Sequence, residues 1–186
     1  MDNHQVDLPD TPTTSRRQLI TTLLAGSAIV AAGPVMASQA SAAPDVPAND
    51  ARDNAALNAA LERETRVAAT YAIAVGATSN PDDKAALLVI HDHHVGYAQA
   101  IKGYLATNAL VPNKTPLASP TGSFANVAVQ LASLEDQTIE IHTGILANLI
   151  GMNAATLIAS IITVEARQSA ALRFVSGSTP LAAAGI

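Results

Sequence analysis

Residues 154–175 read AATLIASIITVEARQSAALRFV, and their apolar side chains recur at steps of three and four residues. That spacing places them on one face of an α-helix. Glu165 and Gln168 fall in the middle of this apolar face. An acid on a buried face costs several kcal/mol unless another group pairs with it. The segment therefore predicts a helix that carries polar groups toward the interior of the protein.

Three other segments repeat this pattern. In each, an inward-facing stripe of apolar residues has polar residues near its centre, namely Glu64, then His91 and His94, then Glu135. Four helices that each bring such a group to the same level predict a shared buried site. Because carboxylates and imidazoles are metal ligands, we expect that site to bind a metal ion.

Turn residues separate the four segments, which we expect to be helical over residues 50–75, 81–106, 123–149 and 154–175. The first and last connections are short, as between antiparallel neighbours. The middle connection, residues 107–122, is long enough to run back along the bundle. We therefore predict an all-α bundle of antiparallel helix pairs, with one long crossover between helices two and three.

The composition excludes several classes of protein. The chain has 186 residues, of which 49% are hydrophobic and 3% aromatic, which suits a single helical domain. It has no cysteine, so thiol catalysis and iron–sulfur clusters are excluded. Its net charge is -5 and its basic residues are scattered, so we expect no nucleic-acid partner.

Residues 1–43 resemble a twin-arginine export signal. Arg16 and Arg17 follow a polar leader, and an uncharged stretch then ends at an A-x-A type site with cleavage expected after Ala42. Pro34 and several small polar residues interrupt the stretch, so we expect no permanent membrane span. The resemblance implies recognition by the Tat export machinery and a periplasmic or extracellular protein. An ordinary Sec signal that contains Arg-Arg is the alternative.

The remaining boundaries follow from these segments. Residues 44–49 are expected to be a linker, residues 50–176 the four-helix domain, and residues 177–186 a flexible tail. The sequence leaves the oligomeric state open.

Four short stretches carry a resemblance to a known family: LNAALERE at 57–64, LED at 134–136, TVEARQ at 163–168 and LR at 172–173. With a weaker match at His94, they resemble the ferritin-like family of exported bundle proteins that includes plant desiccation-related proteins. The similarity covers most of residues 50–176. It implies the ferritin-like bundle topology and a metal site with a Glu on helices one and three and Glu-x-x-His on helices two and four.

Carried over by position, the resemblance assigns Glu64, Glu135, Glu165 and His94 as ligands. The chain departs from the pattern twice, because His91 stands where the second-helix Glu is expected and Gln168 where the last His is expected. A neutral amide is a weaker ligand than imidazole. We thus expect one or two ions of iron or manganese, with a metal-free hydrogen-bonded core as the alternative, at the following residues: Glu64, His91, His94, Glu135, Glu165 and Gln168.

Each of these residues also has a purely structural interpretation. Glu64 could face outward, the histidines of helix two could form a solvated patch, and Glu135 could pair with Arg167 or Arg173. Glu165 and Gln168 could form a hydrogen-bonded core pair. Tyr71 and His142 share the stripes but lie seven residues from Glu64 and Glu135, about 10 Å along the helix. We expect them to be core residues adjacent to the site.

Three functions are compatible with such a site. The first is a ferroxidase-like or other redox reaction with oxygen species, which requires an open coordination position. The second is a non-enzymatic envelope protein with a structural or stress-protective role, and the third is metal storage in a cage. The sequence identifies no catalytic residue, so whether the protein is an enzyme stays open.

Overall fold

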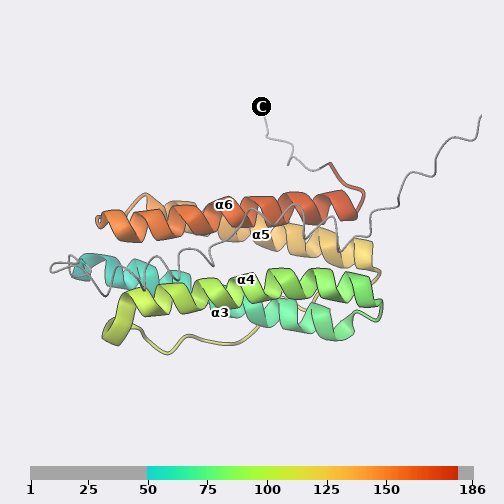
Figure 1. The fold of residues 1–186 in the computed structure, drawn as a ribbon, viewed down its shortest axis with the longest axis horizontal. Helices are drawn as coiled ribbons and strands as arrows, with labels where there is room; N and C mark the ends of the chain where they lie inside the picture. Colours follow the sequence, from blue (N-terminus) through green and yellow to red (C-terminus); the bar gives the residue numbers. More distant parts are fainter. Residues whose placement is uncertain (1–49, 180–186) are drawn as a thin grey trace, which may run out of the picture.

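The computed structural model describes residues 50–179 (Figure 1). Within this range there is no strand, and the four α-helices are α3 (Asn54–Ala77), α4 (Pro81–Leu105), α5 (Phe124–Leu146) and α6 (Met152–Val175). Two short 3-10 turns flank them, at Ala51–Asp53 and Ala106–Asn108. The predicted all-α class is confirmed. No helix in this range is long and apolar enough to cross a bilayer.

Several predicted segments lie outside the described residues. They are the export signal with Arg16 and Arg17, the linker at 44–49, and the tail from residue 180 onward.

The helices form two antiparallel pairs. α3 packs along α4, and α5 packs along α6, while α3 also contacts α5 and α4 contacts α6. The chain between α4 and α5 runs along the length of the bundle, so these two helices point in the same direction (Figure 1). Four hydrogen bonds hold this crossover to α3. In two of them, Arg66 Nε donates to the Thr115 carbonyl at 3.0 Å, and the Leu117 N–H donates to Thr70 Oγ1 at 2.9 Å. The structure thus has the predicted single crossover.

Local signals set where the helices begin. At α4, the Asn80 side chain accepts hydrogen bonds from the N–H groups of Asp82 and Asp83, and Pro81 occupies the first turn. At α5, Ser123 Oγ accepts from the Asn126 N–H. These caps satisfy backbone donors that have no partner inside the helix.

The predicted boundary between the last two helices was wrong by a few residues. α5 ends at Leu146 rather than near residue 149, and α6 begins at Met152. The buried carboxylate of Asp53 explains the difference, because it accepts hydrogen bonds from the Ile150 N–H at 3.0 Å and the Gly151 N–H at 2.8 Å. A Cβ at position 151 would lie 3.0 Å from Asp53 Oδ2, so any side chain there would require the carboxylate to shift slightly. This long-range contact is invisible to local periodicity.

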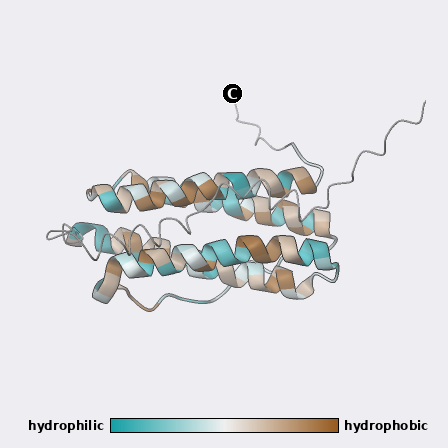
Figure 2. Ribbon diagram, in the orientation of Figure 1, coloured by the Kyte–Doolittle hydropathy of each residue, from teal (hydrophilic) through white to brown (hydrophobic). Residues whose placement is uncertain are grey.

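The bundle core has an apolar cluster at each end and polar residues between them. One cluster includes Tyr71, Leu87 and Leu172, and the other includes Leu57 and Ile158. Figure 2 shows that hydrophilic and hydrophobic residues both occur along every helix. On α3, for example, the buried acid at position 64 follows residues of the second cluster and precedes residues of the first. The polar layer is therefore enclosed along the bundle axis.

Replacing Asp53 with alanine tests the connection between α5 and α6. The substitution leaves two backbone N–H groups without their partner, so we expect unfolding to become easier by about 1–3 kcal/mol. The midpoint of urea denaturation measures the loss. Asp92→Ala is the matched control, because the Asp92 side chain is 73% exposed and should change stability by less than about 0.5 kcal/mol. Equal losses in the two variants would contradict this role of Asp53.

Candidate metal centre

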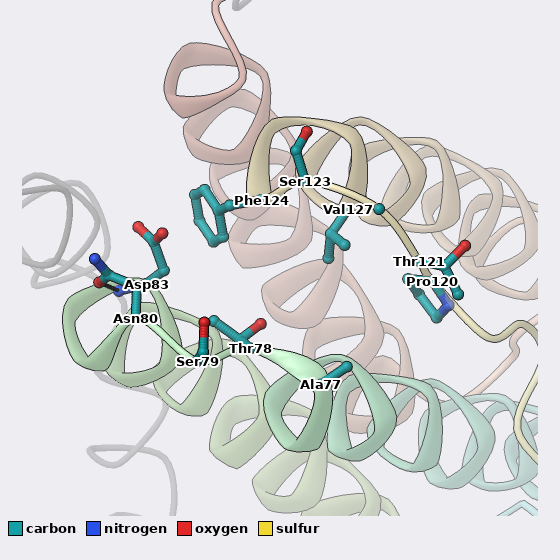
Figure 3. A pocket seen from close by; sticks show the side chains of 11 residues that line it. Ala77, Thr78, Ser79, Asn80, Asp83, Pro120, Thr121, Ser123, Phe124 and Val127 are labelled. Atoms are coloured by element: carbon teal, nitrogen blue, oxygen red, sulfur yellow. Dashed lines mark hydrogen bonds between the residues drawn. The ribbon is translucent and has the colours of Figure 1, made fainter.

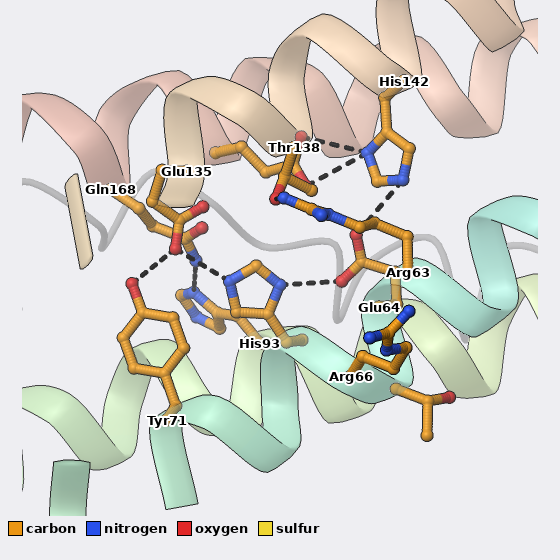
Figure 4. Close-up of polar contacts among 12 residues, drawn as sticks. Arg63, Glu64, Arg66, Tyr71, His93, Glu135, Thr138, His142 and Gln168 are labelled. Carbon is orange, nitrogen blue, oxygen red and sulfur yellow. Dashed lines mark hydrogen bonds and ion pairs between the residues drawn. The ribbon is translucent and has the colours of Figure 1, made fainter. Parts of the chain in front are cut away.

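Side chains from all four helices meet in the middle of the bundle. None of the following residues has any solvent exposure: Glu64 on α3, His94 on α4, Glu135 and His142 on α5, and Glu165 and Gln168 on α6. In Figure 4, Glu64, Glu135, His142 and Gln168 point into the space between the helix pairs. Buried charged groups must pair or bind an ion, so their mutual geometry defines what this layer can do.

His94 lies between two acids and uses both of its ring nitrogens. Nδ1 lies 2.7 Å from Glu64 Oε2, and Nε2 lies 3.0 Å from Glu135 Oε1. The Tyr71 hydroxyl donates a hydrogen bond to the same oxygen of Glu135. Tyr71 also stacks on the imidazole, with ring centroids 5.3 Å apart, while Tyr97 packs edge-on at 5.5 Å. The orientation of the His94 ring is therefore fixed on every side.

His142 connects the third acid, Glu165, to Glu64. Its Nδ1 lies 3.1 Å from the Glu165 carboxylate, and its Nε2 lies 3.4 Å from Glu64 Oε1. Glu64 therefore has an imidazole on each side. Nearby, Arg63 donates hydrogen bonds from Nε and Nη2 to Thr138 Oγ1 at 3.0 and 2.8 Å, which places a positive charge at the edge of the layer.

Protons balance the buried negative charge. Burial raises the pKa of Glu165 to about 8, so this acid is neutral at pH 7. Burial alone would lower the pKa of His94, but the carboxylates of Glu135 and Glu64 outweigh it and raise that pKa well above its ordinary value. Burial likewise opposes charge on His142, yet the hydrogen bond with Glu165 raises its pKa. For Glu64, burial is outweighed by His94, and the pKa is lowered.

These groups fit a metal ion. Glu64, His94 and Glu165 each offer a ligand atom, and the three atoms lie within 4.8 Å of one another. Glu64 Oε1, Glu165 Oε1 and His142 Nε2 are buried and make ion-pair contacts with His142 or Glu64, but they make no hydrogen bond. Burying such atoms is costly unless something else satisfies them. Two carboxylates with imidazoles are a ligand set that suits iron and manganese. The donor chemistry is thus that of a transition-metal site.

Comparison with known proteins agrees with this geometry. The family model of the ferritin-like domain matches residues 52–178. The chain belongs to the ferritin-like family. No curated protein and no solved structure matches it.

The predicted position of His91 in this ferritin-like domain was wrong. Its side chain is 25% exposed, and its Nδ1 lies 2.9 Å from Asp92 Oδ1, away from the buried group. The inward stripe of α4 runs instead through Leu87, Ile90 and His94. Steps of three and four residues allow either position 90 or 91 on that stripe, and the larger gain from burying isoleucine favours 90.

The other predicted site residues of the ferritin-like domain are all brought to the buried layer. Gln168 lies beside it, with its amide nitrogen 3.1 Å from His93 Nδ1. The suggested pairing of Glu135 with Arg173 does not occur. Arg173 instead forms an ion pair with the neighbouring Asp136, which also accepts a hydrogen bond from the Ser169 hydroxyl. The structural alternative of an outward Glu64 is likewise excluded by its complete burial.

Two residues of the ferritin-like site were underestimated, His142 and Tyr71. Both touch its acids directly, although each lies seven residues from the acid on its own helix. Side chains on a helix lean toward its N-terminus. Since α3 and α5 run in opposite directions (Figure 1), Glu64 leans toward His142 and Glu135 leans toward Tyr71. The equal spacing of the two pairs, seven residues on each helix, is the sequence signal that could have revealed these contacts.

The surface pockets of the ferritin-like domain are separate from this layer. One, of about 260 Å³, lies where the α3–α4 connection meets the start of α5, and its lining includes Asn80, Ser123 and Phe124 (Figure 3). Another, of about 510 Å³, lies between α3, α4 and the crossover. No residue of the buried layer lines either pocket, in agreement with the complete burial of its side chains.

The pKa shifts predict how the metal-free ferritin-like domain responds to pH. Glu165 keeps its proton up to about pH 8 when folded, whereas an unfolded glutamate loses it near its ordinary value. The raised pKa values of His94 and His142 act in the same direction. The folded state therefore binds more protons than the unfolded state, so stability should fall as the pH rises from 5 to about 8. Glu64, with its lowered pKa, loses its contribution only at more acidic pH.

Thermal unfolding of chelator-treated protein between pH 5 and 9 measures this slope. Glu165→Gln should flatten it, because glutamine is neutral throughout. A melting temperature that rises between pH 5 and 8 would show that these groups are not buried as described.

Proposed function

We propose that this ferritin-like protein binds iron or manganese in its core through Glu64, His94 and Glu165, with His142 against the two acids. The main support is that these ligand atoms converge within 4.8 Å from three helices, with no exposure to solvent. Such an ion would supply one-electron redox chemistry toward oxygen species. The chain's own residues would hold the ion, exclude bulk water and release the protons that the ion displaces.

The proposal includes a location. The segment with Arg16 and Arg17 would direct the protein through the Tat machinery into the periplasm or out of the cell. There, a metal held in a closed bundle would serve in protection against oxidative stress. Redox turnover with oxygen species is the enzymatic form of this role.

A second candidate is a metal-free bundle with a structural or stress-protective role in the envelope. One observation favours it: His94 pairs with Glu64 and Glu135, and His142 pairs with Glu165, so the acids have partners within the protein itself. Protons alone thus compensate much of the buried charge. The two candidates differ in whether a metal ion stabilises the fold.

Glu165→Gln separates the two candidates. Because Glu165 is neutral in the metal-free protein at pH 7, glutamine should preserve that state while removing a carboxylate ligand. We expect Mn²⁺, or Fe²⁺ without oxygen, to raise the melting temperature of the wild-type chain. At a hundredfold excess over Kd the gain is about 2.7 kcal/mol, which is several degrees for a domain of this size. The variant should lose most of this shift.

The control is His91→Gln, since that histidine lies away from the buried group. It should respond to metal as the wild type does. If the wild-type chain melts at the same temperature with and without either metal, and elemental analysis of purified protein finds neither ion, the metal-free candidate is correct.

A separate prediction concerns export. Replacing both Arg16 and Arg17 with lysine should leave the uncleaved protein in the cytoplasm, because the Tat machinery recognises the arginine pair. Cell fractionation with immunoblotting measures this. Normal export of the lysine variant would instead indicate a Sec signal.

A further inference from the structure

We propose that each bundle holds a single metal ion, and that Glu135, fixed by Tyr71, positions His94 instead of binding the ion. The inference rests on the proposed metal-binding function and specifies which residues at that site are ligands. It departs from the family pattern, which assigns the third-helix glutamate as a ligand.

The first support is the way His94 is shared. A histidine binds a metal through one ring nitrogen, and the other N–H commonly donates to a carboxylate that fixes the ring. Here Nδ1 faces Glu64 Oε2 at 2.7 Å, and a ring nitrogen of His94 lies within 4.8 Å of the ligand atoms of Glu64 and Glu165. Nε2 points the opposite way, 3.0 Å from Glu135 Oε1. If Nδ1 is the ligand atom, Glu135 occupies the supporting position.

The second support is the way Glu135 is held. Its Oε1 accepts hydrogen bonds from both the Tyr71 hydroxyl and the His94 ring. The same tyrosine stacks on that imidazole, with an interplanar angle of 23°. One phenol therefore fixes both the acid and the ring, and all three side chains are fully buried. This arrangement aims Nδ1 at Glu64.

The third support is that the two ends of the site differ. On α3, Glu64 is followed seven residues later by Tyr71. On α5, Glu135 is followed seven residues later by His142. The two ends of the site therefore carry different residues, a phenol at one and an imidazole at the other. The end with His142 has two acids and two imidazoles. The end with Tyr71 has one acid and the neutral Gln168, whose amide nitrogen faces His93. Among residues 50–179 only one group of three acidic or imidazole ligands converges closely enough for a metal ion, and it excludes Glu135.

A pair of adjacent divalent ions needs several carboxylates to offset their mutual repulsion. The end with Tyr71 offers one carboxylate oxygen without a hydrogen bond, Glu135 Oε2. That supply is too small for a second ion, so the geometry points to one.

Mn²⁺ binding to the full chain tests the proposal. Calorimetric titration should give one ion per chain, and the electron paramagnetic resonance spectrum at saturation should be the six-line signal of an isolated ion. Glu135→Gln should keep the same stoichiometry and signal while weakening affinity by roughly 10–100-fold, the usual effect of removing a supporting carboxylate. Glu165→Gln should weaken binding much more than Glu135→Gln does, and His91→Gln should leave it unchanged.

A double-mutant cycle shows whether Glu135 acts through His94. In a His94→Gln background the additional Glu135→Gln substitution should have no further effect on affinity, because the ring that it positions is gone. A directly bound acid would weaken binding again. Tyr71→Phe should also weaken Mn²⁺ affinity, by less than Glu135→Gln does, and should likewise have no further effect in the His94→Gln background.

The outcomes distinguish this inference from the proposed function. Two ions per chain with an exchange-coupled spectrum would overturn it, as would complete loss of binding in Glu135→Gln. In both cases the metal-binding function would stand. If the wild-type chain binds no Mn²⁺ or Fe²⁺, the proposed function and the inference fail together.

Discussion

The contact between His94 and the acids on either side of it is the constraint on which the bundle core depends. Three glutamates and two histidines lie in a layer with no access to water, and isolated charges there would cost far more than a domain's net stability. Each charge must therefore face an opposite one, a proton or a cation. This requirement fixes how α3 and α5 align, because Glu64 has to reach His142 while Glu135 reaches Tyr71. The apolar clusters at either end then pack around an alignment that the polar layer has specified.

Much of the fold could be predicted from periodicity and connection length. Apolar residues at steps of three and four defined the helices, and the long segment between helices two and three implied a crossover, which the structure has. The fold prediction that was wrong is the position of one helix boundary. The end of α5 depends on Asp53, whose partners at Ile150 and Gly151 lie almost a hundred residues away in sequence. No pattern within the α5–α6 segment contains that information.

The site was also predictable in part, for an identifiable physical reason. An acid in the middle of an apolar face is strong evidence of an inward group, so Glu64, Glu135 and Glu165 were placed correctly. For helix two, the sequence did not decide which residues face inward, because its apolar residues and histidines are adjacent in sequence. Neighbouring residues on a helix point in directions that differ by about 100°. Packing of Ile90 decided between the alternatives and left His91 outside. His142 was predicted to lie outside the site because it is seven residues from Glu135 on the same helix. That comparison did not consider Glu64 on the neighbouring antiparallel helix, which His142 contacts.

The closed position of the buried layer has a kinetic consequence. Neither surface pocket reaches it, and its residues are sealed by apolar side chains at both ends of the bundle. Because the side chains of this layer have no solvent exposure, a bound ion would enter or leave only while the packing around them transiently opens. The residence time of the ion would then be governed by the free energy of local opening and not by the strength of the ligands alone. If the site binds an ion as proposed, it would load slowly and would then keep its ion through dilution and through competition from weaker chelators.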